Sequence, residues 1–521
     1  MTDDGPTVKK TKTGHGTENA FVCDALDVFT FHLLLSSSKF ELLKEIEAGG
    51  TTFNGEFFVQ HFGQKEEITG FQNLSVDIWF SAHTYHTWCE IKWLKRKPGA
   101  DKVVEILKKH FPHACPSKLD LVDAIHDALM SNASTLLSSG EPLACIDTAA
   151  GRASLVKYQL AAARSSVVKG IHMRMEPFLL FFIDGASLIN NEDSEWELIF
   201  ALLERPPQQN QSQESSSEHS RVGSHLVVGM QTMYNFWTLP KAVQQGSALR
   251  HAPTSCDYLK APDNQRLRLS QVLVLPPYQG LGLGKIMIQL AYDMAIQKQC
   301  TDLTFEDPSP QLQRVREKLE VEMMCSHPWV VEKVQECLEA SKRCLDNLAV
   351  AARALLPSAT LLSRINQELK IHRRQVQAVW EAVLFIQCGG QCTQAALCQL
   401  IKNRLNVETF GSICAGDAKK KVHPVQDVTG GNRSFIMMAT KESTLPLCGT
   451  SMDEESSESN ATASGRLNVV MVSNEEKELR LQELVEERMG QLHTLSRLLR
   501  KKVSEPSLNT VHLLSNGKLE C

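Results

Sequence analysis

Hydrophobic and polar positions follow two different periods along the chain, and these periods predict where strands and helices form. Short runs rich in β-branched and aromatic residues predict strands. Such runs cover residues 75–93, a strand pair, and residues 155–160, 196–203, 227–236, 271–275 and 301–305. Apolar positions spaced three and four residues apart predict helices. These helices are expected at residues 101–110, 119–130, 172–183, 331–352, 358–372, 373–387, 394–405 and 474–502.

The order of these segments predicts several domains. Residues 1–18 are polar and are expected to be disordered, and residues 19–150 mix short strands with helices as in a small α/β domain. Residues 151–330 form the next unit, in which strands 196–203 and 227–236 make a hairpin around a polar insert, 206–225, expected to be disordered. Residues 331–405 predict a helical domain. The remaining segments are 406–472, loops with an acidic Ser-rich linker, then a helix at 473–503 and a tail at 504–521.

The C-terminal helix is amphipathic. Ser473 and Glu476 form an S-x-x-E capping box at its start. Its apolar stripe consists of Leu481, Leu484, Val485, Met489, Leu492, Leu495 and Leu499. The stripe predicts packing against a partner or against the rest of the chain, with a coiled coil as the alternative.

A glycine-rich turn joins the strand at 271–275 to a helix. The strand ends at Pro276-Pro277, and Gln279-Gly280-Leu281-Gly282-Leu283-Gly284-Lys285 follows. Glycines at a helix N-terminus allow backbone N–H groups to point at an anion, and the helix dipole adds partial positive charge. The turn therefore predicts a site for a phosphate-bearing cofactor.

Three phosphate-binding motifs are compatible with a turn of this kind. A Walker A loop needs a Ser or Thr after the lysine to hold magnesium, and Ile286 stands there. A dinucleotide fingerprint needs G-x-G-x-x-G, whereas the glycines here alternate. The acetyl-CoA pyrophosphate loop, [QR]-x-x-G-x-[GA], matches residues 279–284 in full. A glycine-rich connection without a ligand stays open as the alternative.

Composition narrows the class of protein further. The 521 residues are enough for two to four domains, and a formal net charge of −5 argues against bulk nucleic-acid binding through a basic surface. We expect no membrane span, because the longest apolar run, 178–183, is too short. The 15 cysteines have no paired spacing and are expected to be free thiols. Zinc at Cys388, Cys392 and Cys398 is disfavoured because no histidine has ligand spacing, so we predict no metal.

Four blocks of the chain together resemble a known family. They are residues 176–196 (EPFLLFFIDGASLINNEDSEW), 228–237 (VGMQTMYNFW), 268–284 (RLSQVLVLPPYQGLGLG) and 304–317 (TFEDPSPQLQRVRE). The blocks are similar to those of type B histone acetyltransferase catalytic subunits, which belong to the GNAT superfamily. Weaker likeness extends over most of residues 20–405, and the last hundred or so residues lie outside it.

The resemblance implies an α/β (α+β) fold, with a GNAT-type mixed sheet flanked by helices, a small α/β domain before it and a helical region after it. It implies acetyl transfer from acetyl-CoA directly to lysines in the N-terminal tail of newly made histone H4. It further implies a WD-repeat histone-binding partner and a location in nucleus and cytoplasm, with no direct DNA or membrane binding. Two alternatives stay open: an acetyltransferase acting on another amine, and a catalytically silent histone-binding scaffold.

The resemblance also assigns catalytic residues. A lysine amine has a reference pKa near ~10.4, so a base must remove its proton before it attacks a thioester. Glu306 matches the catalytic Glu of the family, and Asp307 is adjacent. Asp184 stands where the family has Glu, one methylene longer. For Asp307, which precedes Pro308, a helix N-cap is the structural alternative.

Binding residues follow from the same matches. Acetyl and pantetheine contacts are expected from the backbone of Val272, Leu273 and Val274, and a backbone N–H of this strand is expected to stabilise the oxyanion. Pyrophosphate contacts are expected from Gln279, Gly280, Leu281, Gly282, Leu283, Gly284 and Lys285. Substrate contacts are expected from Glu66, Tyr234, Asn235 and Phe236, although both aromatic residues could instead be sheet core. The family's second acidic position beside Glu66 is Gln64 here.

Overall fold

The computed structural model describes residues 19–132, 135–161, 166–204, 225–238, 264–388, 394–410, 474–504 and 511–513. The predicted disorder at 1–18 and at 206–224, and the capping residue Ser473, lie outside these residues. The chain divides into two compact units. One contains residues 1–339, 356–389 and 495–521, and the other contains residues 340–355 and 390–494.

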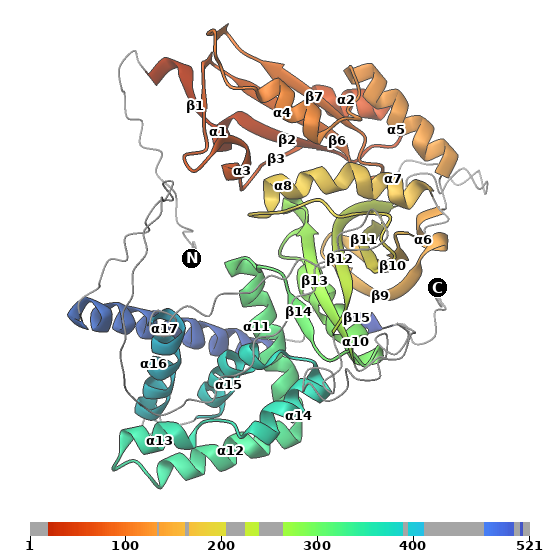
Figure 1. The fold of residues 1–521 in the computed structure, drawn as a ribbon. Helices are drawn as coiled ribbons and strands as arrows, with labels where there is room; N and C mark the ends of the chain where they lie inside the picture. The colour runs from red at the N-terminus through yellow and green to blue at the C-terminus, as the bar shows by residue number, and fades with distance from the viewer. Residues whose placement is uncertain are drawn as a thin grey trace, which may run out of the picture. The chain divides into compact units, whose positions relative to one another are not determined.

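The N-terminal domain is built on a four-stranded sheet of order β3-β2-β6-β7 (Figure 1). β2 (Phe29–Leu34) runs parallel to β6 (Ser75–Ser81), and β3 (Thr51–Asn54) and β7 (Thr87–Lys92) pair antiparallel at the two edges. One core cluster joins the sheet residues Leu34 and Trp79 to apolar residues of α2 (Lys39–Ala48) and α5 (Lys118–Asn132). The predicted strand pair at 75–93 is therefore confirmed, as are the helices expected at 101–110 and 119–130.

Smaller elements complete this domain. They are β1 (Val22–Asp24), α1 (Ala25–Val28), α3 (Val59–Phe62), β4 (Glu67–Thr69), β5 (Phe71–Gln72), β8 (Lys95–Arg96), α4 (Val103–His110) and α6 (Thr135–Ser139). β1 pairs with β4, and β5 pairs with β8.

The central sheet has seven strands in the order β14-β13-β12-β11-β10-β9-β15. All neighbours are antiparallel except β13 and β14, which are parallel. The strands are β9 (Glu141–Thr148), β10 (Gly151–Gln159), β11 (Trp196–Glu204), β12 (His225–Trp237), β13 (Gln265–Val274), β14 (Leu303–Phe305) and β15 (Val511–Leu513). The predicted hairpin of strands 196–203 and 227–236 is confirmed by β11 and β12.

Two strands of this sheet depart from the sequence predictions. β9 lies within residues 19–150, which had been assigned to the N-terminal domain, and its mixed burial shows no alternation. β15 lies within the predicted tail and pairs with the free edge of β9. Three residues carry no period, so only the pairing partner reveals this strand.

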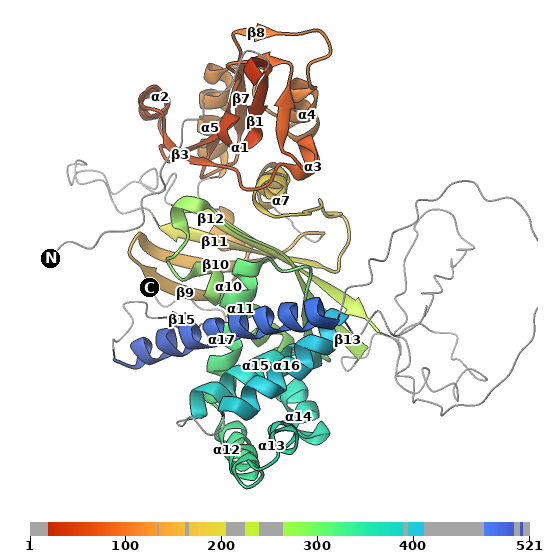
Figure 2. The ribbon, with the colours of Figure 1, turned by 90° about the vertical axis from the view of Figure 1, so that its left-hand side faces the viewer.

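A segment predicted as one helix, 172–183, links the two sheets in three pieces. α7 (Ser166–Met175) is followed by η2 (Glu176–Phe178) and α8 (Leu179–Phe182), with Pro177 at the break. Proline lacks the N–H that would continue the helix. Phe178 and Phe181 pack against aromatic rings of the N-terminal domain, including Phe31. α7 therefore lies between the two sheets in both views (Figure 2).

The helices after the central sheet are α11 (Pro310–Cys325), α12 (Pro328–Lys342), α13 (Leu348–Ala354), α14 (Ala359–Leu369), α15 (Arg373–Gln387), α16 (Gln394–Phe410) and α17 (Asn474–Ser504). The single helix predicted at 331–352 is wrong, because Asn347 caps a new helix by accepting a hydrogen bond from the Val350 N–H. Residues 406–410, predicted as loop, continue α16. The stripe on α17 is confirmed, with Leu481, Leu492 and Leu495 buried.

One segment of the described chain, Leu348–Leu369, has the length and mean hydropathy of a membrane span. The sequence analysis expected none. The structure divides this segment into α13 and α14 around Pro357, and its residues Ala351, Ala352, Leu361 and Ile365 are buried within the protein.

Candidate active site

A β-bulge in β13 determines which backbone groups of this strand face away from β12. Thr232 faces Gln271 and Met233 faces Leu269, so Ser270 is an extra residue in the pairing with β12. Before the bulge, Leu267 and Leu269 bond to β14: the Leu267 N–H donates to Asp302 and the Leu269 C=O accepts from Glu306. Bulges shift the alternation of backbone groups by one residue. Beyond Ser270 the opposite set of residues therefore faces away from β12.

The shift exposes Val272 and Val274 to the space beyond the end of β14. The Leu275 N–H donates to Val228 of β12, so by alternation Leu273 also faces β12 and its two neighbours face away. β14 pairs only with residues 267–269 and ends at Phe305, leaving this side of β13 without a strand. Of the three predicted acetyl contacts, Val272 and Val274 thus present backbone groups to the gap. The Leu273 side chain is core.

The glycine-rich turn follows directly. After the short turn Pro276–Tyr278, Gly280 and Gly282 have φ of +77° and +87°, and Gly282 is the N-cap of α10 (Leu283–Gln297). A Cβ added to Gly280 or Gly284 would meet no atom within 4 Å. The turn therefore forms an open cradle at a helix N-terminus, where an anion is favoured.

Two side chains of this turn are engaged within the protein. The Gln279 amide donates to the Val274 C=O at 3.1 Å, and Lys285 forms an ion pair with Glu322 of α11. Lys285 therefore contributes its charge beside the cradle while its ammonium is held on α11.

Glu306 lies immediately after β14, beside the bulge. Its backbone N–H donates to Leu269, and its side chain is 48% exposed. The Arg268 guanidinium lies 4.0 Å from the carboxylate and stacks over the Phe236 ring at 4.1 Å. The preceding Phe305 is held from the other side by the buried guanidinium of Arg316, 4.0 Å away. Glu306 is thus an accessible carboxylate on a rigid support.

Asp307 does not cap a helix. The N-cap of α11 is Ser309, whose hydroxyl accepts from the Leu312 N–H at 3.2 Å, and the helix begins at Pro310. Asp307 instead adopts a left-handed backbone conformation, with φ of +34°. Such a conformation is costly for a residue with a Cβ and is common at functional sites. Its side chain is exposed beside Glu306.

Asp184 is exposed at the start of a loop that runs from α8 to β11. The loop is fixed at several points along the central sheet. The Gln271 amide donates to the Ser187 C=O at 2.8 Å, and the Tyr234 hydroxyl donates to the Asp193 carboxylate at 3.0 Å. This loop therefore brings Asp184 to the side of the sheet that carries Gln271, the residue after the bulge.

The predicted substrate residues on β12 are largely occupied by this loop. The Asn235 amide donates to the Glu195 C=O at 3.0 Å, and Asn235 is buried. Bonding to Asp193 and partial burial raise the pKa of Tyr234 to about 12. Phe236 supports the Arg268 guanidinium. Their predicted contacts with a peptide stay predictions.

Glu66 has a role inside the N-terminal domain. Its carboxylate accepts from the Phe58 N–H at 2.6 Å, at the start of α3, and its φ is +53°. Phe58 packs against Phe181 of α8, three residues before Asp184. Gln64 is exposed. The structure thus places Glu66 in the layer next to the Asp184 loop, with one carboxylate oxygen already engaged.

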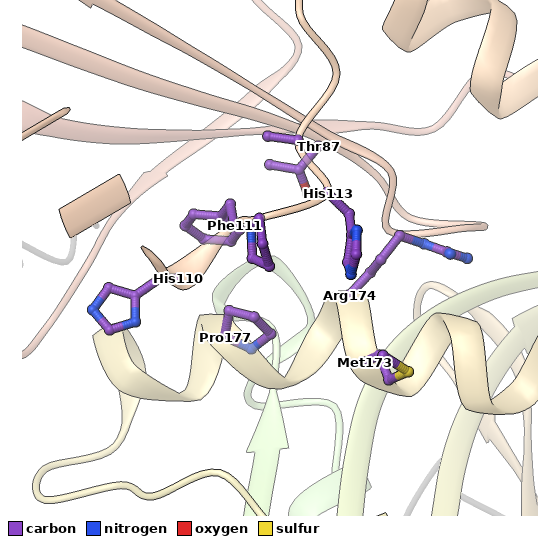
Figure 3. A pocket seen from close by; sticks show the side chains of 9 residues that line it. Thr87, His110, Phe111, His113, Met173, Arg174 and Pro177 are labelled. Carbon is purple, nitrogen blue, oxygen red and sulfur yellow. The ribbon is translucent and has the colours of Figure 1, made fainter. Parts of the chain in front are cut away.

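A small cavity lies between the N-terminal domain and α7 (Figure 3). His110, Phe111 and His113 line it on one side, and Met173, Arg174 and Pro177 on the other. Its volume of about 20 Å³ accommodates one water molecule, so it cannot hold a cofactor. The open gap beside β13 is therefore the better site.

Sequence comparisons agree with this geometry. Residues 21–184 match the model of the histone acetyl transferase HAT1 N-terminus, and residues 227–319 match that of the acetyltransferase (GNAT) family. The second match spans β12, β13, the glycine-rich turn and Glu306.

Similar curated proteins carry one name. A histone acetyltransferase type B catalytic subunit of Zea mays is 22% identical over 416 residues, which cover 76% of this chain and 78% of the relative. Those of Arabidopsis thaliana and Kluyveromyces lactis are 23% and 25% identical, covering 61% and 66% of this chain and 63% and 76% of the relatives. The chain is similar to the type B histone acetyltransferase catalytic subunits over most of its length. It is a lysine acetyltransferase of the GNAT superfamily.

Acetyl-CoA, the co-substrate that a GNAT domain implies, supplies an acetyl group activated as a thioester. The residues beside β13 fit it. Val272 and the N–H of Val274 face the gap and could contact the acetyl and pantetheine part, whereas the Val274 C=O is held by the Gln279 amide. The cradle at Gly280 and Gly282 fits a pyrophosphate. Within the part of the chain that the structure describes, no group of three His, Cys, Asp or Glu side chains could hold a metal. Cys392 of the disfavoured zinc site lies outside that part.

One buried carboxylate near the gap was not predicted from the sequence. Glu176 of η2 is 5% exposed, and burial raises its pKa to about 7. An acidic residue next to Pro177 inside an otherwise apolar run was the available signal. Its contacts with the Asp184 loop and Gln271 could be found only from the structure.

Proposed function

We propose that this chain acetylates lysine amines in the N-terminal tail of histone H4, with Glu306 as the general base. The observation that carries the proposal is the position of Glu306. It follows the last residue of β14, at the point where β13 turns backbone groups of Val272 and Val274 to the gap. A lysine amine approaching an acetyl group on β13 would therefore pass beside its carboxylate.

The proton transfer follows from this arrangement. The incoming lysine is an ammonium at neutral pH and is not nucleophilic. Glu306 accepts one proton from its Nζ atom, and Asp184 and Asp307 add negative charge that favours the approach of the cation. A backbone N–H of Val272 or Val274, facing the gap, would donate to the acetyl oxygen as negative charge develops there. As the lysine nitrogen bonds to the acetyl carbon, the carbon–sulfur bond of the thioester would break, and CoA would leave as a thiol that carries the second proton lost from the nitrogen.

A lysine-rich tail fits the charge of this region. Asp184, Glu306 and Asp307 are all exposed, and the relatives are named histone acetyltransferases. The preference for H4, the partnership with a WD-repeat histone-binding protein, and the location in nucleus and cytoplasm rest on the resemblance. Recovery of a WD-repeat protein with the tagged full chain, and imaging of the same chain in cells, test the last two proposals.

The deciding experiment is acetyl transfer by the purified full chain to an H4 N-terminal peptide, with the products mapped by mass spectrometry. A lysine peptide of equal charge and unrelated sequence is the control. We expect faster transfer to H4. Equal rates would show that the enzyme acts on another amine, and binding of the H4 peptide without transfer would show a silent scaffold.

A further inference from the structure

Glu176 is a buried carboxylate with no role in the proposed acetyl transfer. It lies in η2 between Met175 and Pro177, on the segment that joins the two sheets of this unit. Burying an ionisable group is costly unless hydrogen bonds compensate. The partners of this carboxylate therefore show what it holds.

Its first partner is the loop that begins at Asp184. One carboxylate oxygen accepts a hydrogen bond from the Ile189 N–H. That bond links positions 13 residues apart in the chain and fixes a loop backbone group that belongs to no helix or strand.

Its second partner is Gln271, the residue that follows the bulge in β13. The Gln271 side chain bonds to the Glu176 carboxylate and donates to the Ser187 C=O at 2.8 Å. Its oxygen accepts from the Thr232 hydroxyl, also at 2.8 Å. Glu176 thus accepts from the Ile189 N–H, and Gln271 donates to the Ser187 C=O, so the pair holds both a donor and an acceptor of the loop backbone.

The rest of the loop is fixed independently. Tyr234 bonds to Asp193, and Asn235 bonds to Glu195. Asp184 and Ser187 are three residues apart, so at most about 10 Å of extended chain separates the Asp184 backbone from the hydrogen-bonded Ser187. The Ala186 N–H bonds to the Ile183 C=O, within the loop itself, so the bonds at Ser187 and Ile189 are those that tie the middle of residues 184–190 to β13 and η2.

We propose that Glu176 is a positioning residue that, with Gln271, fixes residues 184–190 beside the acetyl-binding part of β13. The inference rests on the proposed function in one respect, since Asp184 and Val272 are taken from that site. A loop held in this way sets the position of Asp184 relative to the gap. Misplacement by about 1 Å of a group near the reaction can lower the rate about 100-fold.

The test compares Glu176→Leu, which removes the acceptor, with Glu176→Gln, which keeps one acceptor oxygen without charge. Glu45→Gln is the matched control, because Glu45 also binds two loop N–H groups, those of Leu35 and Ser36, but in the N-terminal domain. Amide hydrogen exchange of the full chain is measured over residues 184–190, together with the acetyl-CoA Kd, and kcat and KM for the H4 peptide.

We expect Glu176→Leu to speed exchange in residues 184–190 at least about 10-fold and to lower kcat/KM about 10- to 100-fold, with the acetyl-CoA Kd unchanged. Glu176→Gln should keep the exchange of residues 184–190 and kcat/KM close to the wild-type values, and Glu45→Gln should change neither quantity. Unchanged exchange in residues 184–190 would overturn the inference. So would a loss of acetyl-CoA binding in proportion to kcat/KM, because that marks a general defect of the fold.

The exchange measurement separates this inference from the proposed function. Faster exchange in Glu176→Leu, combined with full activity of a Glu306→Gln variant, would keep the positioning role and reject the base. Normal exchange in Glu176→Leu, combined with an inactive Glu306→Gln variant, would reject the positioning role and keep Glu306 as the base.

Discussion

At the scale of the residue, two glutamates near the gap have opposite surroundings. Glu306 is half-exposed with an arginine 4.0 Å away, whereas Glu176 is buried among backbone and amide donors. An accessible carboxylate can exchange a proton with a substrate, and a buried one can hold structure. These surroundings support the proposed roles of Glu306 in proton transfer and of Glu176 in positioning.

Replacing Glu306 by Gln should lower kcat about 100- to 10,000-fold, because the isosteric amide cannot accept the lysine proton. The acetyl-CoA Kd should stay within about twofold of the wild type, since the backbone of β13 and the glycine cradle are unchanged. Steady-state kinetics and calorimetry measure the two quantities. An undiminished kcat would reject Glu306 as the base.

Replacing Glu176 by Gln should change how stability depends on pH. The pKa of Glu176 is raised from 4.5 to about 7 in the folded protein, so the unfolded chain loses this proton at lower pH than the folded one. As the pH rises from about 4.5 to 7, the unfolding free energy of the wild type should therefore fall relative to that of Glu176→Gln. Above about pH 7 the difference should stay constant. Urea unfolding of both proteins at pH 4.5, 6, 7 and 8 measures the difference, and a constant difference would contradict this.

At the scale of the element, β13 and the turn that follows it build the cofactor site from backbone. The bulge at Ser270 turns Val272 and Val274 toward the gap, and the short β14 leaves that gap open. Gly280 and Gly282 then bend the chain through left-handed conformations into α10. Such a site depends on backbone conformation more than on side-chain identity.

Replacing Gly280 by Ala should weaken acetyl-CoA binding at least about 10-fold, because the new Cβ disfavours φ of +77° and occupies the open cradle. Gly49→Ala is the matched control, since Gly49 has φ of +95° with no atom within 4 Å of an added Cβ, in the N-terminal domain. Both variants should lose about 1 kcal/mol of unfolding free energy. Equal acetyl-CoA affinities in the two variants would contradict a role for Gly280 in the cradle.

At the scale of the whole molecule, one buried histidine, His172, and two partly buried ones set a limit on stability at low pH. Burial lowers the pKa of His86, His110 and His172 to about 4, and both ring nitrogens of His172 lack a partner. Unfolded imidazoles bind protons near pH 6.5, well before these folded ones do. Unfolding free energy present above pH 6.5 is therefore lost as the pH falls toward 4.

Replacing His172 by Leu should make this loss shallower, because one imidazole no longer takes up a proton on unfolding while the buried volume stays filled. Thermal unfolding midpoints between pH 7.5 and 4.5 measure the two slopes. His113→Leu is the matched control, since His113 is exposed and should leave the slope unchanged. Parallel curves for wild type and His172→Leu would contradict this explanation.

Local patterns predicted much of the molecule. The period of residues 75–93 and 196–236 gave the strand pair and the hairpin, and residues 279–284 predicted a cradle for CoA at a strand-to-helix turn. Both depend on neighbouring residues, whose spacing alone determines which side chains share a face. The helix interruptions at Asn347 and Pro177 were not predicted, although each has a local cause. Asn347 caps a new helix with its side chain, and Pro177 lacks a backbone N–H.

The sequence by itself predicted acetyl-CoA as the donor, because a backbone cradle for its pyrophosphate needs a fixed order of glycines within six residues, and four blocks of the chain carried the family resemblance. Only the tertiary structure decided which backbone groups of β13 face the gap, since the bulge exists solely in the pairing with β12. It alone added β15 to the sheet and joined Glu176 to Ile189 and Gln271. Those contacts link residues 13 to more than 360 positions apart, and no local period encodes a distant partner.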